Sequence, residues 1–320
     1  MIIAIASGKG GTGKTTVAVN LALAWGAPVW LLDCDVEEPN AHLFLRADSA
    51  QQEIITVPVP QVDMARCDAC GECSRFCVYH AIVAPGTKPL VFRELCHSCG
   101  GCARVCPRGA ITEVARRIGV IETSEVEGVT LVGGHLDVGV AMSPPLIRAV
   151  KARIPHDGVA LLDAPPGTSC PVITAIRGAD AVVLVTEPTP FGLHDLTLAV
   201  QMVGALGLPM GVVVNRVGIG DNRVHAFCAA HHIPVLQEIP DDRRIAEAYS
   251  QGIPIVEALP EYRALFRQLA ESVTALCAAR RFVTQGDGHE HRGGGETELR
   301  PLNPATGAST TEGANANVRV

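Results

Sequence analysis

The chain has 320 residues, a net charge of −7 and an apolar fraction of 48%. A negative charge disfavours general affinity for nucleic acid or anionic membranes, both of which bind basic surfaces. The N-terminal segment lacks the basic region of a secretory signal, and no run approaches the roughly 20 apolar residues of a membrane span. We therefore expect a cytoplasmic globular protein with no nucleic-acid partner and no membrane span.

Short β-branched runs alternate with helical stretches, which predicts an α/β fold with a doubly wound, mainly parallel sheet. Aromatic residues make up only 4% of the chain, so aliphatic side chains must fill the core. The expected strands cover residues 2–6, 29–33, 129–132, 159–163, 181–186, 212–215 and 235–239. Expected helices begin after Lys14 and recur at residues 143–153, 170–177, 192–206, 221–231, 242–251 and 260–282.

A phosphate-binding loop follows the first expected strand and opens the first helix, which is the context that this motif requires. Its backbone N–H groups and the helix N-terminus favour phosphate oxygens. The Lys14 ammonium suits the β- and γ-phosphates of ATP, and the Thr15 hydroxyl suits Mg²⁺. The predicted ATP- and Mg²⁺-binding residues of this loop are Gly8, Gly10, Gly11, Thr12, Gly13, Lys14, Thr15 and Thr16.

An ordinary phosphate loop does not require a second lysine at Lys9. The segment from Lys9 to Thr16 resembles the deviant Walker A sequence of the MinD/ParA/Mrp superfamily of P-loop ATPases. The resemblance implies a homodimer that sandwiches two nucleotides and in which catalytic Lys9 contacts the ATP of the partner subunit. A solvated loop lysine is the alternative.

Carboxylates follow two expected strands, at the edge where a doubly wound sheet binds its ligands. The family resemblance implies that Asp35 is catalytic and orients the attacking water, while Asp33 supports the Mg²⁺ shell. It also implies that Asp163 lies near Mg²⁺ and that the Gly167 amide lies near the γ-phosphate. Polar strand ends without these roles are the alternative for Asp33 and Asp35.

Two later residues complete the expected nucleotide site. In the family that the chain resembles, an asparagine at the end of a late strand reads the adenine, and Asn215 occupies that position. Asp241, which follows a proline, occupies the usual second base-contacting position.

Between about residues 57 and 120 the alternating rhythm stops, and eight of the twelve cysteines repeat one spacing. This spacing is typical of two-cluster bacterial ferredoxins, in which the fourth cysteine of each run ligates the other cluster. It predicts one 4Fe–4S cluster on Cys67, Cys70, Cys73 and Cys106, and a second on Cys96, Cys99, Cys102 and Cys77. Zinc is the competing interpretation of paired cysteines. One departure is Val78, which stands where a proline usually follows the fourth cysteine.

These features predict three parts. Residues 1–56 and 121–283 form the ATPase domain, residues 57–120 form a small inserted ferredoxin-like domain, and residues 284–320 form a disordered tail. Cys34, Cys228 and Cys277 are expected in the core. Cys170 lies at the same offset from Asp163 as a cluster ligand of the similar nitrogenase iron protein. It is therefore a speculative bridging metal ligand, with a buried structural cysteine as the alternative.

Three classes of function fit the sequence. We favour an ATPase that couples its nucleotide switch to 4Fe–4S clusters, for redox-linked metallocofactor assembly or electron delivery to an unknown partner protein. The alternative is a carrier or scaffold for iron–sulfur clusters, as in the Mrp branch of the family. A spatial-positioning ATPase of the MinD/ParA type is disfavoured, because its membrane version needs a terminal basic amphipathic helix.

Overall fold

A nine-stranded sheet forms the centre of the protein, in the order β11-β10-β9-β1-β8-β2-β7-β6-β3. The computed structural model describes residues 1–46, 50–86 and 88–286. The strands of this sheet are β1 (Ile2–Ala6), β2 (Val29–Asp33), β3 (Gln51–Val62), β6 (Ile111–Val126), β7 (Val129–Leu136), β8 (Val159–Asp163), β9 (Ala181–Thr186), β10 (Met210–Val217) and β11 (Val235–Pro240). The helices packed on it are α1 (Lys14–Ala24), α4 (Pro144–Lys151), α5 (Cys170–Ile176), α6 (Pro190–Ala205), α7 (Arg223–Ala230), α8 (Arg243–Ser250), α9 (Ile255–Ala258) and α10 (Arg263–Gly286), with the short 3-10 turns η1 (Ala41–Leu43) and η3 (Pro260–Tyr262).

The sheet is parallel from β11 to β7, as the sequence predicts. Strand β1 pairs with β8 and β9, and β2 pairs with β7 and β8, all in parallel register. Because helices cover both faces of such strands, their sequences are nearly continuous apolar runs. These runs are easily recognised, and each strand expected from them is present. The carboxyl ends of β1, β2 and β8 consequently meet at one edge of the sheet, where the predicted nucleotide-binding residues lie.

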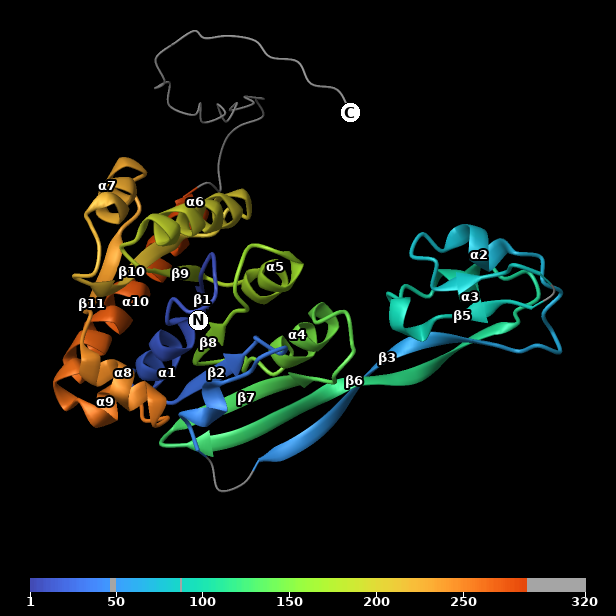
Figure 1. The fold of residues 1–320 in the computed structure, drawn as a ribbon, viewed down its shortest axis with the longest axis horizontal. Helices are drawn as coiled ribbons and strands as arrows, with labels where there is room; N and C mark the ends of the chain where they lie inside the picture. Colours follow the sequence, from blue (N-terminus) through green and yellow to red (C-terminus); the bar gives the residue numbers. More distant parts are fainter. Residues whose placement is uncertain (47–49, 87, 287–320) are drawn as a thin grey trace, which may run out of the picture.

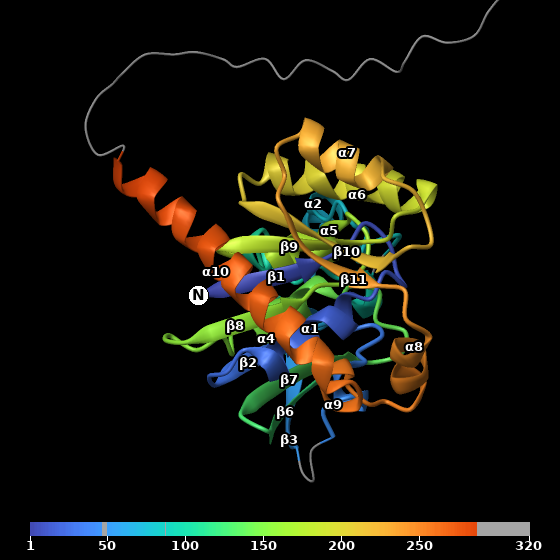
Figure 2. The same ribbon diagram turned by 90° about the vertical axis from the view of Figure 1, so that its left-hand side faces the viewer.

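Helices cover both faces of the sheet, and each face has its own apolar core (Figure 2). On one face, Phe266, Leu269 and Val273 of α10 pack against α1 and are fully buried. Helices α4, α5, α6 and α7 cover the opposite face, where Leu146 and Ile147 are fully buried. The apolar face of the last helix is thus a core-packing face.

Strands β3 and β6 form a long antiparallel ribbon that carries a cysteine-rich segment away from the rest of the molecule (Figure 1). Their pairing runs from Gln51 opposite Thr123 to Val62 opposite Ile111. These two strands were not predicted. Pro58 and Pro60 argue against a strand, but β3 is the edge of the sheet, where proline is tolerated.

The segment between the two ribbon strands, residues 63–110, is here termed the cysteine module. It contains α2 (Glu72–Phe76), α3 (Gly101–Arg104), the turn η2 (Arg93–Leu95) and a two-stranded sheet of β4 (Ile82–Val83) and β5 (Leu90–Val91).

The last helix extends a few residues beyond its predicted end at residue 282, into the segment predicted as tail. Helix α10 continues to Gly286, and the tail expected to be disordered lies outside the described residues from position 287 onward. Over the described ranges, no helix is both long and apolar enough to cross a membrane.

Candidate functional site

The predicted phosphate loop joins β1 to α1, and close contacts require glycine at two of its positions, Gly8 and Gly13. Gly13 has a φ of +93°, and a Cβ placed on it would lie 2.5 Å from Nδ2 of Asn215. A side chain at Gly8 would collide with the backbone carbonyl of Asp195. Asn215 itself donates from Nδ2 to the Thr12 carbonyl at 2.9 Å, so β10 is tied directly to the loop. The loop is thereby held in one shape at the N-terminus of α1.

Thr15 and Asp163 form a pair of oxygen donors beside the loop. The Thr15 hydroxyl donates to Oδ2 of Asp163 at 2.6 Å. The other oxygen, Oδ1 of Asp163, is buried and has no hydrogen-bond partner among the described residues. Burial, and then the neighbouring Asp33 carboxylate, raise the pKa of Asp163. An orphaned carboxylate oxygen next to a hydroxyl fits a hard cation such as Mg²⁺.

Asp33, at the end of β2, is buried and accepts three backbone N–H groups. Oδ1 accepts from Asp35 at 3.1 Å, and Oδ2 accepts from Asn40 and Ala41 at 3.0 Å each. The buried Asp33 carboxylate therefore fixes the backbone of residues 35–41, which are termed here the switch segment. Burial followed by the charge of Asp33 raises the pKa of Asp35 to about 6. A carboxyl group titrating in this range can exchange a proton near neutral pH.

A cavity of about 400 Å³ opens over the loop. This volume lies within the range of small-molecule sites. Lys14, itself buried, lies at the base of this cavity. The cavity brings together most of the predicted nucleotide residues with several that were not predicted. Its lining includes Gly10, Gly11, Gly13, Lys14, Thr15, Thr16, Asp35, Asn215, Arg216, Asp241, Asp242 and Tyr249. The amide of Gly167, expected near the γ-phosphate, donates in this structure to the Ser7 carbonyl at 3.0 Å.

The additional lysine of the loop, Lys9, has an ion-pair partner that was not predicted from the sequence. Its Nζ lies 3.7 Å from Oε2 of Glu187, whose other oxygen lies 2.9 Å from Nη1 of Arg216. Glu187 follows β9, the neighbour of β1, and its side chain is only 10% exposed. The position of Glu187 at a strand's carboxyl end was the available signal, because ligand-facing residues gather there.

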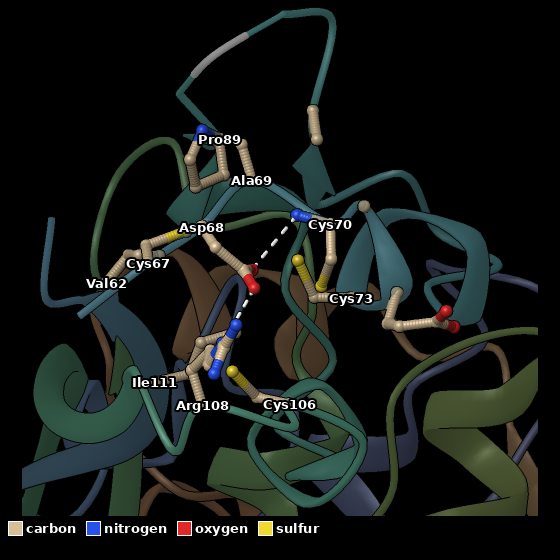
Figure 3. A pocket seen from close by; sticks show the side chains of 13 residues that line it. Val62, Cys67, Asp68, Ala69, Cys70, Cys73, Pro89, Cys106, Arg108 and Ile111 are labelled. Atoms are coloured by element: carbon tan, nitrogen blue, oxygen red, sulfur yellow. Dashed lines mark hydrogen bonds and ion pairs between the residues drawn. The ribbon is translucent and has the colours of Figure 1, made fainter.

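The eight module cysteines separate into the two predicted sets, each around its own cavity. One cavity is lined by Cys67, Cys70, Cys73 and Cys106 (Figure 3). The other is lined by Cys77, Cys96, Cys99 and Cys102. Each cavity thus receives three cysteines from one run and the fourth from the other run. The two are termed here the first and second cysteine sites.

The two runs also share an unusual backbone. Ala69 and Ser98, which occupy equivalent positions, have φ values of +57° and +56°. The glycines after the second cysteine of each run, Gly71 and Gly100, likewise have positive φ. Each cysteine site also has one backbone N–H group directed at a sulfur atom. Ser98 donates to Sγ of Cys96 at 3.4 Å, and Ala110 donates to Sγ of Cys106 at 3.3 Å.

The chemistry of the cysteine sets fits iron–sulfur clusters. Sulfur ligands and N–H donors to sulfur are what such clusters use. Burial raises the pKa of the thiols of Cys73 and Cys96, and that of Cys102 to about 11, so these groups need a bound cation to be held as thiolates at neutral pH. In the described part of the chain, no three His, Cys, Asp or Glu side chains converge closely enough for a single metal ion.

The remaining cysteines lie outside the module. Cys34, Cys228 and Cys277 are buried, as predicted. Cys170 is exposed at the first residue of α5, so the alternative of a buried structural cysteine is wrong. Its role as a bridging ligand stays a prediction. His80 and His97, which lie near module cysteines in the sequence, are exposed.

Comparison with known proteins decides the family. The profile of the CobQ/CobB/MinD/ParA nucleotide-binding domain matches residues 3–255. The chain belongs to this family. It is a P-loop ATPase, and the resemblance to the MinD/ParA/Mrp superfamily is confirmed. The matched range includes the cysteine module, residues 63–110.

Similar proteins include curated relatives and solved structures. An uncharacterized protein of Methanocaldococcus jannaschii is 30% identical over 258 residues, covering 79% of this chain and 90% of the relative. A protein named iron–sulfur cluster carrier protein in Pyrococcus horikoshii is 26% identical, covering 85% of this chain and 84% of the relative. Among solved structures, the septum site-determining protein MinD of P. horikoshii with Mg-ADP has a TM-score of 0.54 and 25% identity, covering 87% of this chain and 98% of MinD.

Proposed function

We propose that this chain is an ATP-dependent carrier of iron–sulfur clusters, whose cysteine module holds two 4Fe–4S clusters for a client protein. The observation that carries the proposal is the pair of cavities, each lined by one complete four-cysteine set. The relatives named iron–sulfur cluster carrier proteins support this function. They favour it over the redox-linked role that the sequence analysis preferred.

The nucleotide site supports ATP hydrolysis by residues with distinct roles. The Asp163 carboxylate and the Thr15 hydroxyl would hold Mg²⁺, which supplies charge stabilisation to the phosphates. Lys14, buried in the loop, neutralises phosphate charge. Asp35 lines the same cavity, where it would orient water and accept its proton. Asn215 and Asp241 line the part of the cavity that would take the base.

Dimerisation through a nucleotide sandwich is part of the proposal. Lys9 is the residue that would reach the partner's nucleotide. In the single chain it instead lies beside Glu187. Forming the dimer therefore requires Lys9 to exchange Glu187 for a phosphate on the partner.

A continuous set of backbone contacts could couple the nucleotide to the clusters. The Val36 carbonyl, one residue after Asp35, accepts the N–H of Leu136 at the end of β7 at 2.8 Å. Strand β7 pairs with β6 from Gly119 to Val126. Strand β6 begins at Ile111, which lines the first cysteine site. Movement of the switch segment is thus connected to the module by hydrogen-bonded strands.

The test is transfer of labelled iron from the reconstituted full chain to an apo-ferredoxin that needs a 4Fe–4S cluster. We expect ATP to accelerate transfer, and Lys14→Ala to abolish the acceleration while leaving bound iron unchanged. Iron that stays on the chain in the presence of ATP would contradict the carrier function.

Electron delivery is the second candidate. Four cysteines around each site would leave no open iron, which suits a permanent redox centre. In the same experiment, this function predicts reduction of an added acceptor without loss of iron.

A further inference from the structure

The two cysteine sites are each closed by a contact between equivalent residues of the two runs, but the chemistry of the contact differs. At the first site, Asp68 follows Cys67, and Arg108 lies two residues after Cys106. At the second site the same positions hold His97, which follows Cys96, and Tyr79, two residues after Cys77. Each contact thus joins the run that supplies three ligands to the run that lends the fourth.

At the first site this contact is an ion pair (Figure 3). Nε of Arg108 donates to Oδ2 of Asp68 at 2.7 Å, and Oδ1 of Asp68 accepts the N–H of Cys70 at 3.3 Å. The side chains are 62% and 39% exposed, respectively. An exposed ion pair is weak and is screened by salt.

At the second site the contact is an aromatic stack. The rings of Tyr79 and His97 lie 3.4 Å apart at their centroids and only 7° from parallel. Both residues line the second cavity. Such a contact has little dependence on ionic strength, since it rests on contact between two ring faces and not on a pair of opposite charges. The cysteines below it are also better covered, because Cys96 and Cys102 are buried whereas the first site has no buried cysteine among its four.

We propose that these contacts are clasps that hold the borrowed cysteine in place and set how readily each site loses its cluster. The first site, closed by the Asp68–Arg108 clasp, loses its cluster first and does so faster as ionic strength rises. The second site, closed by the Tyr79–His97 clasp, retains its cluster and does not respond to salt. This inference rests on the proposed presence of two clusters and adds which of them is exchangeable.

The experiment follows release of iron from the reconstituted full chain to a coloured ferrous chelator at low and high ionic strength. For the native chain, high salt should accelerate the release of half of the bound iron by about two- to fivefold, the range expected for an exposed ion pair. Arg108→Gln should show the faster release already at low salt and no further response. The charge-exchanged double variant, Asp68→Arg with Arg108→Asp, should restore slow release and the salt response.

Matched variants separate the clasps from general loosening of the module. Tyr79→Leu should accelerate release of the other half of the iron about two- to tenfold at every ionic strength, whereas Tyr79→Phe should not. Arg75→Gln removes an ion pair with Glu72 and a hydrogen bond to the Cys70 carbonyl, both inside a single run. It leaves the contacts of both borrowed cysteines in place and should therefore leave both rates unchanged.

Three outcomes would count against these ideas in different ways. If both halves of the iron respond equally to salt, or if Arg75→Gln matches Arg108→Gln, the clasps are overturned and the proposed function stands. If the reconstituted chain shows no 4Fe–4S spectrum, the proposed function fails and the clasps with it.

Discussion

Replacing Glu187 with glutamine is expected to strengthen ATP-dependent dimerisation. In the single chain, the Glu187 carboxylate lies between Lys9 at 3.7 Å and Arg216 at 2.9 Å. If Lys9 acts on the partner's nucleotide, this contact must break before the dimer closes. The variant removes the negative charge but keeps the shape of the side chain. Less free energy is then needed to release Lys9 for contact with the partner's nucleotide.

The size of the effect follows from the exposure of the pair. Lys9 is 33% exposed and Glu187 is 10% exposed, so solvent screens much of their attraction. Partly exposed ion pairs contribute about 0.2–1 kcal/mol. A symmetric dimer releases two such pairs, hence about 0.4–2 kcal/mol, or about two- to thirtyfold in the dimerisation constant.

The assay is sedimentation velocity of the full chain with a non-hydrolysable ATP analogue, over a series of protein concentrations. Glu187→Gln should dimerise at lower concentration than the native chain. In a Lys9→Ala background, the same substitution should have no effect, because the released group is absent. Arg216→Gln controls for loss of the other ion pair. Equal effects of Glu187→Gln with and without Lys9 would refute the reasoning.

Three further predictions concern the loop, the metal site and the core. Gly13→Ala should abolish ATP binding in calorimetry while Gly10→Ala, whose Cβ would meet nothing within 4 Å, should retain it. Because the pKa of Asp163 is raised, Mg²⁺–ATP affinity should fall as pH drops through that pKa, by up to about tenfold per unit, and Asp163→Asn should lose this dependence. The same raised pKa means that the nucleotide-free protein loses stability as pH rises from the unfolded value of 3.8 toward the folded one, since only the unfolded state has then lost the proton. Phe266→Ala should lower the free energy of unfolding in urea by about 3–5 kcal/mol, because Phe266 is fully buried.

The parts of the molecule that could be predicted from sequence are those fixed by local chemistry. Strand β1 and the glycines that follow it specify a phosphate loop. At position 13 only glycine can adopt the φ of +93° and leave room for the Asn215 side chain. Strand β8 ends at Asp163, whose place in the site follows from parallel pairing with β1. In each case the residue type and the strand end are enough to locate the group.

The parts that could not be predicted depend on contacts between distant segments. Strand β3 was missed because two prolines obscure its alternation, and only its edge position makes them acceptable. The pairing of Lys9 with Glu187 requires knowing that β9 lies next to β1, which no local pattern reveals. The Asp68–Arg108 and Tyr79–His97 clasps likewise join residues of different runs, and the spacing that predicts the borrowed cysteines does not predict these contacts.

The ribbon of β3 and β6 gives a physical reason for placing the cysteine module where it is. A flexible linker would uncouple the module from the nucleotide, whereas paired strands transmit displacement along their length. The ribbon is paired continuously from Gln51 and Thr123 to Val62 and Ile111, apart from one irregularity after Ile55. At its inner end, β7 pairs with β6 and is bonded through Leu136 to Val36 of the switch segment. A change at the phosphates would therefore have a hydrogen-bonded path from the switch segment through β7 to β6, which begins at Ile111 in the lining of the first cysteine site. Cys106 is the borrowed ligand of this site, which we infer to be the exchangeable one.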